Sequence, residues 1–427
     1  MNGRLIMSLL AAIYSVGVLA QSADTTDMDI RENPIILFDN GNIDEESVPT
    51  YINRKANHIT YNGADWSALR EAIANSSQSP VSVIHIGDSH IQAEIGTSVI
   101  REMLQLDFGN GGRGLLSPLR LSGTNQPHDY GFESGSSWSI EKIMKAPWTN
   151  LMGFNGTSLT LRGNRGNIRL STAENDESYN PFSSVNIFYT GNLVVTGVSD
   201  EYGMPLEYSV SHQNGVAQIQ LAKPISKIDI SLESKGSLTI FCASVSNNRP
   251  GIIYHAIGNN GATYATYNRI GTTAQGISHL KPNLVIISLG TNEAFGKLDL
   301  MSFRSSMDRL IKSVMEHNPQ SEILLVTPME CERSSVYRVG RGKRRRRVRT
   351  YAVNQNILPI RNEILRYGRE NHIAVYDWYS VAGGAGASGR WFNDKLFGGD
   401  RIHHTASGYR LGGKLLYEAL IKALTEK

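Results

Sequence analysis

Five short apolar runs, each next to an amphipathic segment, constrain the fold of this chain more than any other feature. They are continuous and rich in Val and Ile, as expected for strands buried on both faces of a parallel sheet. The neighbouring segments repeat apolar residues at helical spacing, as in residues 91–106. This alternation predicts an α/β fold with a doubly wound parallel five-stranded sheet, in which ligands bind outside the carboxyl ends of the strands. The runs are VSVIHIG (81–87), GIIYHAIG (251–258), PNLVIISLG (282–290), SEILLVTPM (321–329) and HIAVYDW (372–378).

A long stretch with a different pattern separates the first two runs. Residues 120–245 hold short segments in which apolar and polar residues alternate, which is typical of antiparallel strands. We therefore expect an all-β sandwich module inserted into an α/β domain formed by residues 62–119 and 246–427. Its aromatic residues could form a carbohydrate-binding platform, but such residues more often fill a sandwich core. They are Trp138, Trp148, Phe154, Phe188 and Tyr189.

The N-terminus has the pattern of a secretory signal peptide. Residues 1–20 carry one early positive charge at Arg4, an apolar stretch, and small residues near the expected cleavage site. The apolar stretch is shorter than the roughly 20 residues that a membrane-spanning helix needs. The sequence thus predicts an exported protein, periplasmic or extracellular, with a polar tether at residues 21–61 and no membrane span after the signal is removed. An ordinary N-terminal helix is the alternative.

Net charge and cysteine content disfavour several classes of protein. The chain of 427 residues has a formal net charge of +3 at pH 7, too small by itself to indicate nucleic-acid binding, which needs a concentrated basic face. Cys242 and Cys331 fit neither a disulfide-rich scaffold nor a metal-ligand spacing. They could pair in an oxidising compartment, and the sequence leaves that question open.

One stretch, RVGRGKRRRRVRTY (338–351), concentrates positive charge after the fourth apolar run. We expect either a solvated, flexible loop or a docking surface for an anionic envelope polymer. A nucleic-acid role is disfavoured by the predicted export and by the lack of interleaved aromatic residues. The central arginines are Arg344, Arg345, Arg346 and Arg347. A glycine-rich stretch at residues 378–392 is also expected to be flexible and to contact substrate.

The first apolar run ends on Gly-Asp-Ser-His, where a strand gives way to a helix. A side chain at such a turn projects from the carboxyl edge of the sheet, where substrate would lie, and helix N-terminal amides point toward it. Ser89 is therefore placed to act as a nucleophile. The alternative is a helix N-cap, since serine is a preferred residue there.

Residues that follow the later strands supply what a serine nucleophile needs. His403 can remove the serine proton, and Asp400 can hold the histidine and stabilise its positive charge. The negative oxygen that develops on an attacked carbonyl needs preorganised donors, each worth on the order of 3 kcal/mol. The candidate donors are the amides of Ser89 and Gly261 and the side chain of Asn292.

A metal site is an alternative for this cluster, because hydrolytic metal centres use histidine and carboxylate ligands. We favour no metal and no cofactor, since His85 lies within a buried run, whereas Asp88 and His90 flank the serine and order its turn. The residues that raise the alternative are His85, Asp88, His90, Asp400, His403 and His404.

Four short blocks resemble those of the SGNH, or GDSL-like, hydrolase superfamily. They are GDSH, the glycine of NNGAT, the asparagine of GTNE and the Asp-x-x-His of DRIH, in this order and each at a strand end. The resemblance implies that Ser89 is the nucleophile, that His403 is the base and that Asp400 is its partner. It also implies that Ser89, Gly261 and Asn292 form the oxyanion hole. The superfamily's usual Asn-Asp is Asn292-Glu293 here, which leaves the amide donor in place.

An exported chain with a β module between the serine and glycine blocks further resembles bacterial peptidoglycan O-acetylesterases, which remove acetyl groups from the C6 hydroxyl of muramic acid. We therefore predict a serine esterase that removes O-acetyl groups from a cell-envelope glycan through an acyl-enzyme. Its partner is an O-acetylated glycan polymer. The alternatives are an acetyl esterase acting on xylan or another polysaccharide, transfer of the acyl group to a sugar hydroxyl, and a catalytically silent glycan-binding protein.

Overall fold

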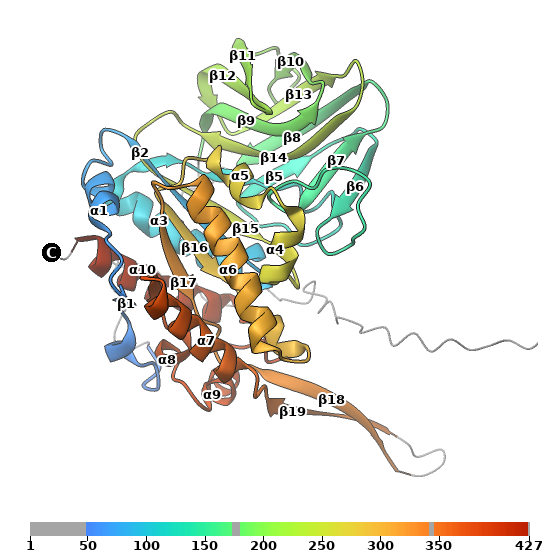
Figure 1. Cartoon of the computed structure of the whole chain (residues 1–427). Coiled ribbons are helices and arrows are strands. Elements are labelled where there is room, and N and C mark those ends of the chain that lie inside the picture. The colour runs from blue at the N-terminus through green and yellow to red at the C-terminus, as the bar shows by residue number, and fades with distance from the viewer. Residues whose placement is uncertain (1–47, 173–179, 341–345, 426–427) are drawn as a thin grey trace, which may run out of the picture.

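The computed structural model describes residues 48–172, 180–340 and 346–425. The predicted signal peptide, much of the predicted tether, and Arg344 and Arg345 lie outside the described residues. Two parts are distinct in Figure 1, an α/β domain and a β-rich insertion that caps one end of it.

Seven strands form the main sheet, so the prediction of five was too low. The five predicted strands occupy its centre in the order β20-β17-β16-β2-β15, and every neighbouring pair among them is parallel. A parallel β3 extends the edge beside β15, and an antiparallel β1 extends the edge beside β20. These edge strands have three and two residues, too few to form a recognisable apolar run. The bounds are β1 (Ile59–Thr60), β2 (Pro80–Gly87), β3 (Asn110–Gly112), β15 (Gly251–Gly258), β16 (Leu284–Ser288), β17 (Glu322–Val326) and β20 (Ala374–Tyr376).

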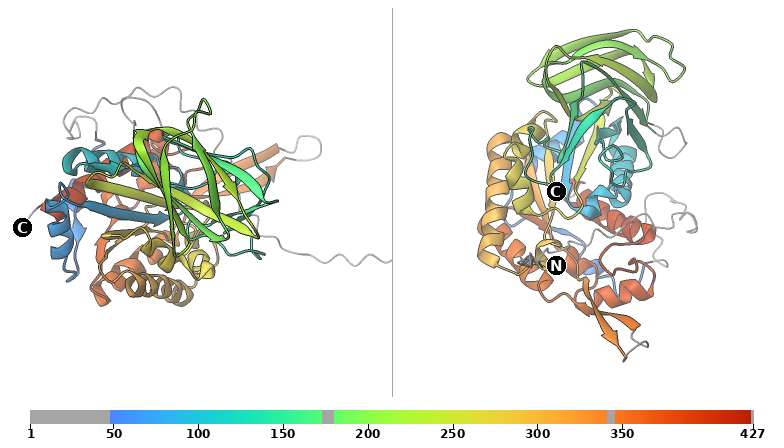
Figure 2. Two further views of the ribbon diagram at one scale, coloured as in Figure 1. Left: turned by 90° about the horizontal axis from the view of Figure 1, so that it is seen from above. Right: turned by 90° about the vertical axis from the view of Figure 1, so that its right-hand side faces the viewer.

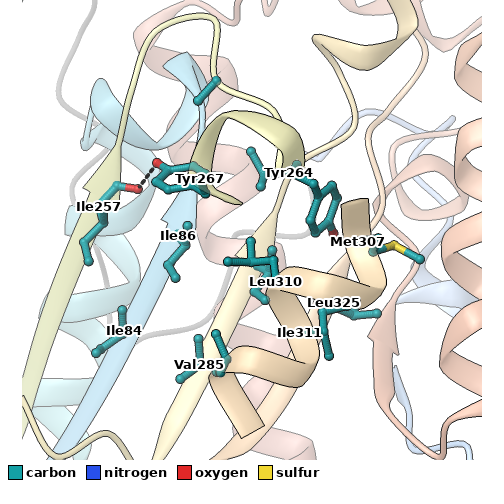
Figure 3. Packing of buried hydrophobic residues seen from close by; sticks show 14 of the residues in the cluster. Ile84, Ile86, Ile257, Tyr264, Tyr267, Val285, Met307, Leu310, Ile311 and Leu325 are labelled. Carbon is teal, nitrogen blue, oxygen red and sulfur yellow. Dashed lines mark hydrogen bonds between the residues drawn. The ribbon is translucent and has the colours of Figure 1, made fainter. Parts of the chain in front are cut away.

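Helices cover both faces of this sheet (Figures 1 and 2). Along β2, Ile84 and Ile86 enter the core beneath α4 to α7, whereas Val81 and Val83 enter the core beneath α1, α3, α9 and α10. Figure 3 shows the first core, where α6 covers the isoleucines of β2. The helices are α1 (Ser67–Ala74), α2 (Ser89–Gln92), α3 (Ile95–Phe108), α4 (Tyr264–Ile270), α5 (Thr273–Ser278), α6 (Leu300–His317), α7 (Ile357–Glu370), α8 (Trp378–Val381), α9 (Ala387–Asn393) and α10 (Ala406–Thr425), with 3-10 turns η3 (Arg54–Ala56) and η4 (Glu293–Phe295).

The insertion consists of two antiparallel sheets whose facing side chains form one hydrophobic core. Its strands begin and end close to the predicted limits of 120 and 245. Its two ends lie side by side, because the Asn247 backbone amide donates to the Gly111 carbonyl (3.2 Å). The strands are β4 (Gly114–Leu116), β5 (Tyr130–Glu133), β6 (Trp138–Lys142), β7 (Thr157–Leu161), β8 (Arg165–Thr172), β9 (Phe182–Gly191), β10 (Val194–Ser199), β11 (Tyr208–Gln213), β12 (Val216–Ile225), β13 (Lys227–Glu233) and β14 (Leu238–Ser246).

The aromatic residues of the insertion mainly fill cores. Trp138 is buried between the two sheets, whereas Phe154 and Phe188 are buried where the insertion packs on the α/β domain. Trp148 and Tyr189 are partly buried against these same cores. None of the five therefore stands out as an exposed sugar platform.

Two predicted irregular segments are more ordered than expected. The described part of the tether, residues 48–61, folds onto the α/β domain through the buried Ile59, and its β1 pairs with β20. The glycine-rich stretch 378–392 contains α8 and most of α9, and Trp391 is fully buried with its Nε1 donating to the Ala382 carbonyl. This stretch is therefore a packed part of the domain, since its large aromatic residue needs burial.

The basic stretch is not a loop but a β-hairpin of β18 (Glu332–Val339) and β19 (Arg346–Val353). The hairpin projects from the body, at the end of the molecule away from the insertion (Figures 1 and 2). Cys242 and Cys331 are both buried and free, so they do not pair. Among helices in the described ranges, none has the length and apolar character required to span a bilayer.

Candidate active site

The catalytic candidates gather at the point where the strand order of the main sheet reverses. β15 lies on one side of β2 and β16 on the other, so the loops that leave these strands diverge at the carboxyl end of β2. Doubly wound sheets bind ligands at this kind of position. Ser89 lies two residues after the end of β2 and is the first residue of α2. Asp88, not Ser89, caps the helix by accepting a hydrogen bond from the His90 amide (2.9 Å), so the cap alternative for the serine is wrong.

Ser89, His403 and Asp400 form a continuous hydrogen-bonded chain. The Ser89 Oγ lies 2.8 Å from His403 Nε2, and His403 Nδ1 lies 2.6 Å from Asp400 Oδ2. The other oxygen of Asp400 accepts the backbone amides of Ile402 (2.9 Å) and His403 (3.0 Å), which fixes the carboxylate within its own turn. The spacing Asp-x-x-His is therefore a local structure, while the serine is brought to it by the sheet.

The surroundings keep Asp400 ionised and make His403 a stronger base. Burial acts to raise the pKa of Asp400, but the hydrogen bond and charge of His403 and the two backbone amides lower it to about 2. Burial acts to lower the pKa of His403, but the hydrogen bond and charge of Asp400 outweigh it and leave that pKa above its usual value. The histidine can thus accept a proton from the serine and hold it beside a negative partner.

The two predicted oxyanion donors outside the serine lie on the neighbouring loops. Gly261 follows β15 with φ +81°, a conformation that favours glycine. Asn292 follows β16, and its Nδ2 donates to Asp88 Oδ2 (3.0 Å) and to the Ala262 carbonyl (3.0 Å). Both hydrogens of this amide are therefore in use, since Nδ2 carries two. Donation to an oxyanion requires Asn292 to release or share one of them.

Glu293, which stands where the superfamily usually has aspartate, has a structural role. Its Oε1 accepts the Tyr264 backbone amide (2.9 Å) at the start of α4, the helix that follows the Gly261 loop. Burial raises the pKa of Glu293 to about 7. The buried glutamate thus ties the Asn292 loop to the Gly261 loop.

A polar cluster that the sequence did not reveal joins the insertion to the Gly261 loop. The Gln92 Oε1 accepts the Asn260 backbone amide (2.9 Å), next to Gly261. Its Nε2 donates to Thr124 Oγ1 (2.8 Å) and Asn125 Oδ1 (2.7 Å), which lie on the β4–β5 connection of the insertion. The Asn260 Nδ2 also donates to Asn125 Oδ1 (3.0 Å). We call Gln92, Thr124, Asn125 and Asn260 the Gln92 cluster.

The histidines that suggested a metal site have other partners. His85 Nδ1 lies 2.7 Å from the Tyr254 hydroxyl and its Nε2 lies 2.6 Å from Ser288 Oγ. Burial lowers the pKa of both His85 and His90 to about 3, so each is neutral. His404 packs among aromatic rings that include Trp391. Within the described ranges, no three His, Cys, Asp or Glu side chains converge in a way that could hold a metal ion.

Sequence comparison identifies the class of protein that this fold and site define. Residues 239–411 match the GDSL-like Lipase/Acylhydrolase family. The matched range contains Gly261, Asn292, Asp400 and His403, whereas Ser89 lies before it. Together with the fold, the match supports a GDSL-like, or SGNH, hydrolase, and thus a carboxylic ester hydrolase. No curated protein matches the sequence.

The solved structures add one informative likeness in fold. A peptidoglycan O-acetylesterase aligns with 86% of this chain and 99% of its own, with a TM-score of 0.69 and 19% identity. At this identity the likeness shows a shared fold. A family two carbohydrate esterase from Cellvibrio japonicus (10% identity, 69% of this chain and 98% of that chain, TM-score 0.28) and a lipase/acylhydrolase from Enterococcus faecalis (20% identity, 40% and 77%, TM-score 0.29) are less similar, with scores too low to indicate the same overall fold.

Proposed function

We propose that this chain is an exported serine esterase that removes O-acetyl groups from a cell-envelope glycan, with the C6 O-acetyl of muramic acid in peptidoglycan as its substrate. The observation that carries the chemistry is the hydrogen-bonded chain from Ser89 through His403 to Asp400. Its distances are those of a base already in contact with the proton that it removes. This arrangement favours a working enzyme over a silent glycan-binding protein.

In the proposed reaction, His403 takes the proton of Ser89 as Oγ attacks the carbonyl carbon of the acetyl ester. The backbone amides of Ser89 and Gly261 and the side chain of Asn292 stabilise the negative oxygen of the tetrahedral intermediate. His403 then donates its proton to the departing sugar hydroxyl, which leaves an acetyl group on Ser89. Water, activated by the same histidine, releases acetate and restores the serine.

A likeness in fold supports peptidoglycan as the substrate. The fold shared with a peptidoglycan O-acetylesterase extends over 86% of this chain, a share too large to be limited to the α/β domain. The insertion would then help to hold the glycan, and the predicted signal peptide would deliver the enzyme to the cell envelope. A sugar hydroxyl that replaced water in the second step would make the enzyme a transferase.

The deciding experiment measures acetate released from O-acetylated peptidoglycan and from acetylated xylan by the wild-type enzyme and by Ser89→Ala. We expect the larger kcat/KM on peptidoglycan and no release by the variant. Faster release from xylan would reject peptidoglycan in favour of acetylated xylan as the substrate. Equal release by Ser89→Ala and the wild-type enzyme would reject the serine mechanism. Cell fractionation of the full chain and of a variant without residues 1–20 tests export.

A further inference from the structure

Three arginines of the β18–β19 hairpin lie on one of its two faces. Arg338 lies directly opposite Arg347, and Val336 lies opposite Arg349. Residues opposite each other share a face, as do residues two apart on one strand. Arg338, Arg347 and Arg349 therefore lie together, and we call them the arginine face. Tyr337 and Val348, which are paired with each other, lie on the other side.

The charge of the arginine face is not balanced within the described residues. All three arginines are exposed, and none of them forms an ion pair in the ranges that the structure covers. The one acidic residue on either strand, Glu332, is at the base of the hairpin and pairs with Arg401 (2.8 Å). Like charges placed directly opposite destabilise a strand pair, and an isolated hairpin is marginally stable. An anion bound between the arginines would remove this repulsion.

The base of the hairpin is attached to the turn that carries the catalytic pair. The Glu332 backbone amide donates to the Arg401 carbonyl (3.0 Å), and the Tyr351 hydroxyl donates to the Gly399 carbonyl (2.8 Å). Arg401 lies between Asp400 and His403 in the chain. At about 3.3 Å per residue, Arg349 and Arg347 lie roughly 13 and 20 Å along the strand from its base at Val353. The arginine face is therefore too far along the hairpin to touch the reacting ester, but near enough to touch the same polymer.

We propose that the arginine face binds carboxylates of the polymer whose ester is cleaved, one or two sugar repeats away from the scissile bond. This inference rests on the proposed function. Arginine binds carboxylates through two parallel hydrogen bonds, and peptidoglycan carries carboxylates on its peptide stems. A row of charges along two strands suits a chain with repeated anions. A lipid surface fits less well, because Arg346, opposite Val339, interrupts the apolar side of the hairpin.

The test compares the triple variant Arg338→Gln, Arg347→Gln, Arg349→Gln with a control of the same charge change. The control replaces Arg249, Arg309 and Arg369, which are exposed on the α/β domain away from the hairpin, by glutamine. We expect KM for O-acetylated peptidoglycan to rise roughly tenfold in the hairpin variant, as for the loss of three exposed charge contacts, and to stay unchanged in the control. The defect should shrink as salt is raised. The kcat on the polymer should not change, because remote contacts bind ground and transition states equally, and kcat/KM on nitrophenyl acetate should not change, because this small ester does not reach the arginine face. Lysines at the three positions should restore only part of the affinity, because lysine keeps the charge but cannot form the two parallel hydrogen bonds.

A binding assay separates failure of this proposal from failure of the proposed function. Ser89→Ala, with and without the three glutamines, is sedimented with insoluble peptidoglycan and, in parallel, with vesicles of anionic phospholipid. Loss of binding to peptidoglycan on removal of the arginines supports the proposal even if the wild-type enzyme releases no acetate from that polymer. Equal sedimentation of both proteins with peptidoglycan overturns it, and arginine-dependent binding to vesicles alone assigns the face to a membrane instead.

Discussion

The insertion and the β18–β19 hairpin both contact the catalytic edge, but they are attached in different ways. The insertion has a hydrophobic core of its own and reaches the Gly261 loop through the Gln92 cluster. The hairpin has no such core, and side chains such as Tyr337 remain about half exposed (49%). It contacts the catalytic turn only at its base. A change in the insertion can therefore disturb an oxyanion donor, whereas a change along the hairpin can alter only what binds to it.

The largest effect is expected at the catalytic residues, near which both the insertion and the hairpin are attached. Loss of activity there is the reference for changes in either region. Ser89→Ala, His403→Ala or Asp400→Ala should each lower kcat on nitrophenyl acetate by about 10⁴-fold or more, as in other serine hydrolases. The losses should not add, because the three side chains act as one unit. Steady-state kinetics of the single and double variants provide the check. A double Ser89, His403 variant far slower than either single variant would contradict the shared chain.

A substitution in the Gln92 cluster tests whether the insertion supports the oxyanion donor Gly261. Asn125→Ala removes the oxygen that accepts hydrogen bonds from Gln92 and Asn260, so the loop that carries Gly261 loses support. We expect kcat on nitrophenyl acetate to fall roughly tenfold, a part of the 10²- to 10³-fold that a whole oxyanion donor contributes. Asn164→Ala, on an exposed part of the insertion, serves as the control. An unchanged kcat with a raised KM for polymer would mean that the insertion, like the hairpin, acts only by binding the polymer.

The pH dependence tests whether the hairpin base influences the catalytic pair. His403 must be neutral to accept the serine proton, and its pKa is raised, so kcat/KM should increase with pH through a midpoint above 6.5 and fall about tenfold per unit below it. Asp400→Asn removes the carboxylate that raises this pKa most, which leaves burial to lower it against the charge of Asp88 alone, so the midpoint of the residual activity should move to lower pH. Glu332→Gln should leave the midpoint in place. A shift in that variant would show that the hairpin tunes the histidine.

The smallest effect is expected where the hairpin joins the domain. Tyr351→Phe removes one exposed hydrogen bond to the Gly399 carbonyl, so the free energy of unfolding should fall by no more than about 1 kcal/mol. Urea denaturation measures this change, and kcat on nitrophenyl acetate should stay the same. A clear loss of kcat would mean that the hairpin holds the catalytic turn in place.

The sequence predicted what depends on local pattern and chain order. Long apolar runs identified the five central strands, and the residues after two of them include Ser89 and Asn292. The Asp-x-x-His turn was also expected at a strand end, but it lies between α9 and α10. It could not predict the Gln92 cluster, because Thr124 and Asn260 are 136 residues apart in the chain and neither belongs to a regular pattern. The hairpin was missed for another reason. Its arginines lie on both faces of the two strands, as Arg346 and Arg347 do, so apolar and polar residues do not alternate regularly. The concentrated charge therefore suggested a loop, although the two segments pair as strands.

The adjacent ends of the insertion have a consequence for how enzymes of this architecture diversify. The chain leaves the α/β domain near Gly111 and returns at Asn247, and the Asn247 backbone amide and side chain donate to the Gly111 and Asn110 carbonyls, so both connections to the main sheet lie at one place. Strands of the insertion that do not pack on the α/β domain can therefore be lengthened, lost or replaced over evolutionary time without changing the register of β2 against β15. The connection that carries Thr124 and Asn125 does not have this freedom, since it completes the surroundings of Gly261. New glycan specificities are therefore expected to arise in the outer strands, while this inner loop changes slowly.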